Sequence, residues 1–330
     1  MKRLFLVTLL FVCFGICAGE LHFEPLFHSS SVYFRSEKVR QCRIFYREKG
    51  SQEWLETFEP QFDSTAPAQY RTSIVNLKEN TEYEVQVQIR VGTRNRINAK
   101  GTFRTWADRV PIAKTIVLTP EQVKNGYAIR NVKGKADGWI RYTTKPGTVV
   151  RAKKGVRQAL LVDRCEYVIV ENMVIRGGDT HGVVLDHCKY VRLRNLDISN
   201  WFNPEGWWFE KKNGRIRNAR YKHLYSHNGI DIRFGYGQVI ERCYIHDPAL
   251  TSNEWRYGHP DGPQGIGPCK PRSTVIRYND ICGSDLKWWN DGIAGPYNFD
   301  ADGGLNRDCD VYGNYIAFAN DDGIELDGGQ

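Results

Sequence analysis

Four acidic residues gather near the end of the sequence: Asp291, Asp321, Asp322 and Glu325. Asp291 and Asp322 each precede a Gly-Ile pair, so they occupy equivalent places in two copies of one short pattern. If the two copies lie side by side, these carboxylates crowd together, and like charges so close raise one another's pKa. The pattern therefore predicts either a proton donor or a bound cation at this place.

Polar and aromatic residues that suit a sugar substrate occur in the segments around these acids. Flat rings stack on sugar faces, and histidine, arginine and lysine handle protons or anions. A structural role is the alternative for each of them. The candidates for substrate contact are Asp231, Arg233, His227, His259, Asp261, Lys270, Trp207, Trp208, Trp255, Trp288 and Trp289.

The elements that must position these residues come from an internal repeat. Six stretches share one seventeen-residue template that ends in Ile, and they begin at residues 159, 182, 229, 265, 292 and 323, the fifth with an insertion and the last cut short. Apolar residues alternate within each copy, which indicates strands. The copies start 23, 47, 36, 27 and 31 residues apart, which fits one stacked turn with loops inserted on the binding side.

Stacking of the copies predicts two columns on an outer face. One column holds the residue before each template Gly, namely His181, Asn228, Gln264, Asp291 and Asp322. The other column begins at Val184 and Asp186 and continues through Asp231 and Arg233 to Gly267 and Cys269, then Ala294, Glu325 and Asp327. Adjacent strands lie about 4.8 Å apart, so residues distant in sequence become neighbours on this face.

The repeat resembles the right-handed parallel β-helix superfamily of pectate lyases, polygalacturonases and chondroitinase-B-like enzymes. The resemblance lies in Asn195-Leu196-Asp197-Ile198, Asn314-Tyr315-Ile316 and Asp321-Asp322-Gly323-Ile324-Glu325, and it covers about residues 110–330. Polygalacturonase-like hydrolases place two Asp motifs on adjacent turns. The resemblance therefore implies that Asp291 and Asp322 act as acid and base, with Asp321 and Glu325 in support.

Two other functions remain open at this point. In a calcium-assisted lyase, carboxylates would hold Ca²⁺ against a uronate, and Lys270 or Arg233 would remove the proton next to its carboxyl group. In a non-catalytic surface protein, the same face would bind a sugar or a protein. Apart from that Ca²⁺, we expect no cofactor.

Residues 20–106 read as a separate β-sandwich, with strands expected at 31–34, 43–47, 70–75, 83–90 and 101–105. The segment from Leu77 to Val85 resembles the tyrosine corner of fibronectin type III domains, in which a Tyr hydroxyl is tied to the backbone upstream. We expect residues 107–114 to be a linker and residues 115–330 to be the right-handed parallel β-helix. The whole chain is thus expected to be all-β.

The N-terminus has the layout of a secretory signal peptide over residues 1–19, with Lys2 and Arg3 before an apolar run and small residues at its end. We expect a secreted protein, extracellular, periplasmic or at the cell surface, without an integral membrane segment. The chain stops within a template copy, so we expect it to be truncated at its C-terminus.

The net charge of +8 falls to +6 without Lys2 and Arg3, and this modest excess suits a polysaccharide partner, including an anionic one. Export and the lack of a recognition motif argue against nucleic acid. We expect a monomer. Of nine cysteines, seven follow the signal segment. We interpret them as buried thiols; Cys165 and Cys188, one rung apart, are the pair close enough for a disulfide.

Overall fold

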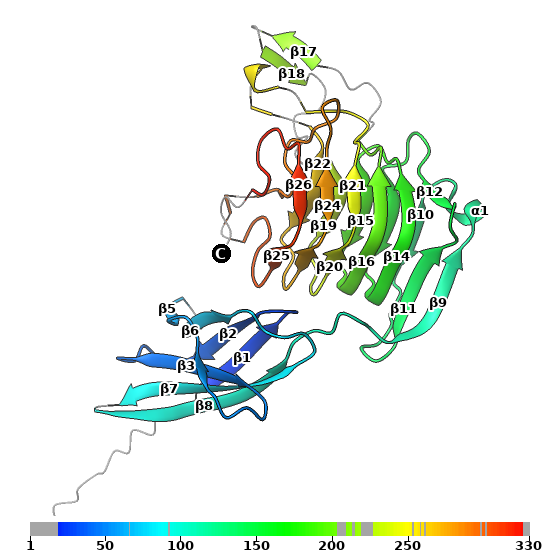
Figure 1. Cartoon of the computed structure of the whole chain (residues 1–330). Helices are drawn as coiled ribbons and strands as arrows, with labels where there is room; N and C mark the ends of the chain where they lie inside the picture. The colour runs from blue at the N-terminus through cyan, green and yellow to red at the C-terminus, as the bar shows by residue number, and fades with distance from the viewer. Residues whose placement is uncertain are drawn as a thin grey trace, which may run out of the picture. The chain divides into compact units, whose positions relative to one another are not determined.

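The structure is a computed structural model. It describes residues 19–65, 67–91, 93–202, 209–212, 215–218, 227–252, 254–257, 259–260, 262–297, 299–300 and 302–325. The expected signal peptide therefore lies outside the described residues, except for Gly19. The chain divides into two units, Met1–Ala107 and Asp108–Gln330, and both are built almost entirely of strands (Figure 1).

The first unit contains two antiparallel sheets of four strands each. One sheet has the order β1-β2-β6-β5, with β1 Glu20–Pro25, β2 Ser30–Arg35, β5 Gln61–Asp63 and β6 Gln69–Ile74. The other has the order β4-β3-β7-β8, with β3 Cys42–Glu48, β4 Leu55–Glu56, β7 Glu82–Val91 and β8 Arg94–Arg104. Each of the five expected strands lies within or overlaps one of these elements.

Both sheets of the first unit contribute to one hydrophobic core. Val32 and Phe34 come from the first sheet, and Ile44 and Val87 come from the second. The hydroxyl of Tyr83 accepts a hydrogen bond from the backbone N–H of Lys78 at 2.9 Å. This is the bond to the upstream backbone that the sequence predicts for a tyrosine corner.

The second unit is dominated by two parallel sheets. The first, which we call the site sheet, has the order β10-β13-β15-β19-β22, with β10 Tyr127–Arg130, β13 Gln158–Asp163, β15 His181–Asp186, β19 Asn228–Arg233 and β22 Gln264–Cys269. The larger sheet comprises β9 Ile112–Leu118, β11 Trp139–Thr144, β12 Val149–Arg151, β14 Glu166–Arg176, β16 Lys189–Ser199, β20 Val239–Glu241, β21 Tyr244–His246, β23 Val275–Arg277, β24 Asp280–Cys282, β25 Asp310–Tyr312 and β26 Tyr315–Ala317. The remaining elements are α1 Pro120–Val123, η1 Trp255–Tyr257 and the hairpin of β17 Phe209–Lys212 with β18 Arg215–Asn218.

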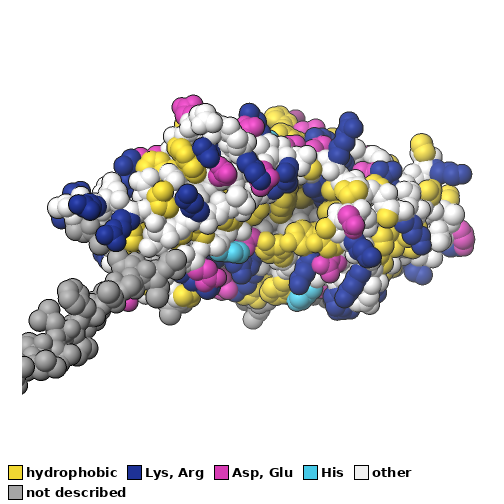
Figure 2. Space-filling model, turned by 90° about the horizontal axis from the view of Figure 1, so that it is seen from below, with side chains coloured by type: hydrophobic (Ala, Val, Ile, Leu, Met, Phe, Trp, Pro, Cys, Tyr) yellow, Lys and Arg dark blue, Asp and Glu magenta, His cyan; other side chains and the backbone are white. Residues whose placement is uncertain are grey.

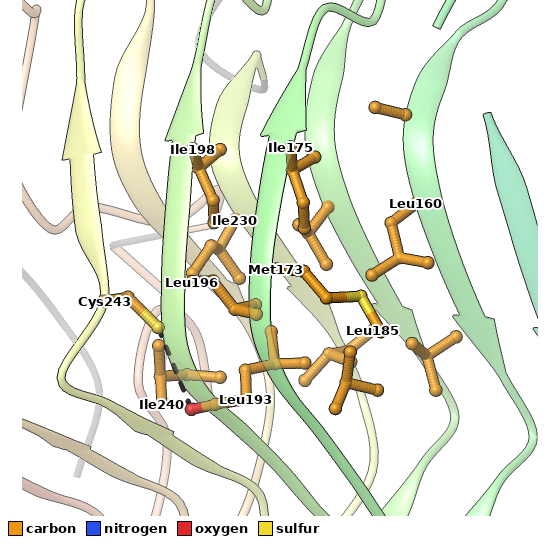
Figure 3. Close-up of a cluster of buried hydrophobic side chains, with 14 of the residues drawn as sticks. Leu160, Met173, Ile175, Leu185, Leu193, Leu196, Ile198, Ile230, Ile240 and Cys243 are labelled. Carbon is orange, nitrogen blue, oxygen red and sulfur yellow. Dashed lines mark hydrogen bonds between the residues drawn. The ribbon is translucent and has the colours of Figure 1, made fainter. Parts of the chain in front are cut away.

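The chain alternates between the two parallel sheets as it proceeds (Figure 1). Strands β13, β15, β19 and β22 add in turn to the site sheet, while β14, β16 and β20 add in turn to the larger sheet. Side chains from both sheets fill the space between them, as Leu160, Leu185, Leu193 and Ile240 illustrate in Figure 3. Because the apolar row of each copy is buried by its neighbours, stacking is what stabilises each copy.

The packing explains the Gly that begins four of the template copies and the Ile that ends them. A Cβ atom at Gly229 would lie 2.6 Å from Cγ2 of Ile245 and 2.9 Å from the carbonyl oxygen of Gly265. In the copies that begin at Gly182, Gly229, Gly265 and Gly292, the final Ile thus occupies the space next to the first residue. The same arrangement recurs at Gly292, whose Cβ would lie 2.4 Å from Cγ2 of Ile316.

A network of buried charges joins the strands of the larger sheet. The register aligns Arg194, Glu241 and Arg277, and the latter two have no exposed area. Glu241 accepts hydrogen bonds from Nε of Arg194 at 2.6 Å and from Nε of Arg277 at 2.8 Å. Asp108 accepts one from Nη2 of Arg277 at 2.6 Å, and its carbonyl accepts one from Nη1 of Arg192 at 2.7 Å. Burial lowers the pKa of Arg192 to about 10.

The boundary between the two units falls within the expected linker, between Ala107 and Asp108. Strand β9 begins at Ile112, so residues 112–114 of that linker belong to a strand of the second unit, and Asp108 is bonded to Arg277 of the same unit.

Three general expectations can be compared with the described residues. None of their helices is long and apolar enough to cross a membrane. The seven cysteines from Cys42 to Cys309 are all free thiols, and five of them are buried. On the face shown in Figure 2, Lys and Arg side chains are interspersed with Asp and Glu and do not form one continuous basic patch.

Candidate active site

The strand register brings the residues of the predicted columns together. Residue Asn228 is paired with Gln264, and bridges from Ile266 to Ile293 and from Ile293 to Ile324 extend the alignment by two more copies. By this register Asp291 follows Gln264 in the first column, and Asp322 follows Asp291. The second column is aligned likewise, with Val184 beside Asp231 and Asp186 beside Arg233.

Three of the four predicted catalytic carboxylates form one cluster, which we call the Asp cluster: Asp291, Asp321 and Asp322. One oxygen from each lies within 4.8 Å of the others. Asp291 is 3% exposed, Asp321 is half-buried and Asp322 is exposed. Glu325 is half-buried on the next column, and its backbone N–H donates to the carbonyl of Ile293; its carboxylate is not one of the three close oxygens.

Asp291 is held in place by three N–H donors. Its Oδ1 accepts from the backbone N–H of Asp322 at 3.1 Å, and its Oδ2 accepts from Nε2 of Gln264 at 2.9 Å and from Nδ2 of Asn290 at 2.7 Å. Its pKa is nevertheless raised, first by burial and also by the nearby charge of Asp321, while these hydrogen bonds act in the opposite direction. The result is a fixed carboxyl group that retains a proton more readily than an ordinary aspartate.

Two amide residues of this site had no assigned role in the sequence analysis. Gln264 and Asn290 are 2% and 1% exposed, and each donates its amide N–H to Asp291. Their amide oxygens, Oε1 and Oδ1, are buried and accept no hydrogen bond from the described residues. The position of Gln264 in the column indicated its proximity to Asp291, but the pairing of Asn290 depends on its side-chain conformation. Three carboxylate oxygens this close could also hold a divalent cation.

Two predicted contact residues from the loop after β21 reach the Asp cluster. Nε2 of His259 lies 3.2 Å from Oδ2 of Asp321. The indole N–H of Trp255 donates to the carbonyl of Asn320 at 2.7 Å, and its ring contacts that of His259 at 5.3 Å between centroids. These residues form one wall beside the carboxylates.

The other tryptophans of the prediction have different environments. Trp289 has no exposed area, stacks on Trp201 at 5.7 Å and donates its indole N–H to the carbonyl of Ala317. Its prediction as a substrate contact is therefore corrected: it is part of the hydrophobic core. Trp288 is half-buried, with its indole N–H bonded to the carbonyl of Ser252. Trp207, Trp208 and Asp261 lie outside the described residues.

A second polar cluster lies on β15 and β19. Asp231 is 4% exposed and accepts hydrogen bonds from Nε of Arg233 and, at 3.2 Å, from Nδ2 of Asn228. Burial raises its pKa, and the charge of Arg233 opposes the increase. His181 had no predicted role, and its Nε2 lies 3.5 Å from Oδ2 of Asp231. The ring of His227 stacks on the ring of His181, with 6.1 Å between the centroids.

The ring of His181 is neutral in this environment. Burial is the main cause that lowers its pKa, and the charge of Arg233 adds to it. The backbone N–H of Asn228 donates to Nδ1 at 3.1 Å, and Nε2 lies 3.1 Å from Nη2 of Arg233 and 3.5 Å from Oδ2 of Asp231. His181, Asn228, Asp231 and Arg233 therefore form one polar cluster in which only Arg233 is partly exposed, and Oδ1 of Asn228 is buried and accepts no hydrogen bond from the described residues.

Lys270 pairs with two aspartates that are not members of the Asp cluster. Its Nζ lies 2.9 Å from Asp302 and 3.6 Å from Asp300, and 4.9 Å from the ring centroid of Tyr297. The hydrogen bond to Asp302 raises the pKa of Lys270. This shift is opposite to the one that a lysine base requires at neutral pH.

Comparison with known proteins adds no assignment to the geometry of this site. No protein-family model matches the chain, and no curated protein matches it.

Proposed function

We propose that this chain is an exported glycoside hydrolase that cleaves an extracellular polysaccharide. In this proposal the second unit is a right-handed parallel β-helix like those of the pectate lyases and polygalacturonases, and the first unit is a fibronectin type III-like sandwich that carries no chemistry. The alternation of the chain between two parallel sheets supports the first assignment, and the bond between Tyr83 and Lys78 supports the second.

The observation that carries the proposed activity is the Asp cluster. Hydrolysis of a glycosidic bond needs a proton donor for the leaving oxygen and a carboxylate that activates water or attacks the sugar. Asp291 has a raised pKa, so we assign the transferable proton to Asp291 with its neighbour Asp321. Asp322 is the exposed member of the cluster, and we assign it the role of the base.

Elimination by a lyase is the second candidate, and the two predicted bases argue against it. Lys270 is paired with Asp302, and Arg233 is paired with Asp231. The observation that favours a lyase is the close approach of three carboxylate oxygens in the Asp cluster, which could hold a cation such as Ca²⁺.

The test is an activity assay of the native chain on a panel of neutral and acidic polysaccharides. We expect new reducing ends without the ultraviolet absorbance of an unsaturated uronide. Asp291→Asn and Asp322→Asn should each lower the rate by about 10²–10⁴-fold, the usual contribution of a general acid or base. Asp137→Asn is the matched control, because Asp137 is an exposed aspartate of the same unit.

The alternatives predict different products. If the product absorbs ultraviolet light and a chelator abolishes the activity, the reaction is elimination and not hydrolysis. Binding of a polysaccharide by the native chain without cleavage would identify the face as a binding surface.

A further inference from the structure

Trp255 combines exposure with a fixed position next to the Asp cluster. The residue lies in the short helix η1 and is 53% exposed. Its indole N–H is bonded to the carbonyl of Asn320, which directly precedes Asp321. His259 contacts both the indole ring and the carboxylate of Asp321, so a single imidazole separates the indole from the carboxylate.

The position of the exposed indole is fixed through the acceptor of its N–H, the carbonyl of Asn320. Asn320 is anchored on both sides, because its backbone N–H donates to the carbonyl of Trp289 at 3.0 Å and its Nδ2 donates to Oγ of Ser252 at 3.3 Å. The acceptor for the Trp255 N–H is therefore part of the packed structure. A ring held in this way loses little conformational entropy when a ligand stacks on it.

The hydrophobic effect alone does not account for this arrangement. Trp201 and Trp289 are fully buried, which is the usual outcome for a large aromatic ring near a core. Trp255 instead presents more than half of its area to solvent while its polar edge is satisfied by Asn320. An indole with its polar edge satisfied and its face exposed beside carboxylates can stack on a ligand there.

We propose that Trp255 is a stacking platform for one pyranose ring of the substrate, next to the bond that the Asp cluster cleaves. The ring would lie on the indole through a face of C–H groups that carries no ionised substituent. The π face of an indole is electronegative, and the neighbouring carboxylates are acidic, so an anionic sugar face would be repelled there. This inference names the sugar contact of the proposed hydrolase and rests on that proposal for the position of the cleaved bond.

Binding and cleavage are measured separately to test it. Affinity for the polysaccharides of the panel is measured by affinity electrophoresis and calorimetry in an Asp291→Asn background, in which cleavage should be about 10²–10⁴-fold slower. Trp255→Ala should raise the Kd of the preferred polysaccharide about tenfold, which corresponds to about 1.4 kcal/mol, because the aromatic face that stacks on the sugar is lost. Trp255→Tyr keeps a flat ring and should stay within about threefold of the parent.

Two controls separate stacking from folding. Trp54→Ala removes an indole from the first unit, where Arg47 lies 4.5 Å from the ring centroid, and should leave the Kd unchanged. Circular dichroism and thermal unfolding check that Trp255→Ala is folded, and in the active background this variant should raise KM more than it lowers kcat.

The outcomes for the platform and for the hydrolase are distinct. The platform is rejected if Trp255→Ala leaves the Kd unchanged. It is also rejected if Trp255→Tyr raises the Kd as much as Trp255→Ala does. Either result holds against the platform even if the native chain hydrolyses the polymer. Weaker binding by Trp255→Ala, with no cleavage by the native chain, supports the platform and rejects the hydrolase. If the native chain binds none of the polysaccharides, both are rejected.

Discussion

Replacement of Glu241 by Gln should strongly destabilise the second unit. Glu241 has no exposed area and accepts hydrogen bonds from Arg194 and Arg277, the second of which is also fully buried. In the Gln variant the shape is kept and the negative charge is lost. Arg277 would then lose the carboxylate of Glu241 and keep that of Asp108, and one amide N–H would face a guanidinium group.

The magnitude follows from the burial of the partners. Breaking a buried ion pair by removing one charge typically costs about 3–5 kcal/mol, because the other charge is left uncompensated. For a unit of this size, 1 kcal/mol shifts the melting temperature by roughly 2–4 °C. We therefore expect Glu241→Gln to lower the melting temperature of the second unit by about 6–20 °C.

Calorimetry and urea denaturation of the full chain would measure the effect. Glu121→Gln is the matched control, since Glu121 pairs with Lys124 on the surface of the same unit, where both side chains are more than half exposed. Such a pair is worth about 0–1 kcal/mol. If Glu241→Gln costs no more than Glu121→Gln, the buried network does not hold the strands together and the reasoning is wrong.

Two further predictions concern His181 of the second polar cluster and the Gly that begins a template copy. Because the pKa of His181 is lowered in the folded state, the unfolded state binds more protons below about pH 6.5, and stability should fall as the pH drops below that value. The free energy of unfolding of the native chain should fall by up to about 1.4 kcal/mol per pH unit more than that of His181→Gln, as measured by parallel urea titrations. Identical pH profiles of the two proteins would contradict a neutral buried ring. Gly229→Ala places a Cβ against Ile245 and the Gly265 carbonyl and should cost about 1–3 kcal/mol. Gly323→Ala meets no atom of the described residues within 4 Å and should change stability by less than about 0.5 kcal/mol; equal losses in thermal melts would refute the packing explanation.

The repeat carried most of what could be predicted about the second unit. Its period-two pattern predicted strands, and the equivalent positions of Asp291 and Asp322 predicted neighbours on one face, as the register shows. This succeeded because parallel strands in register stack equivalent residues about 4.8 Å apart, whatever the length of the loops between them. The proposed polysaccharide substrate and export remain predictions.

Side chains outside the repeat could not be placed in this way. The exposure of Trp255, the burial of Trp289, and the pairing of Lys270 with Asp302 depend on how inserted loops of different lengths fold back on the sheets. The sequence by itself thus determined which residues share a column, because strand periodicity is local and repeats along the chain. Only the tertiary structure decided which of them are buried, paired or open to a ligand, because burial and pairing depend on contacts between distant segments.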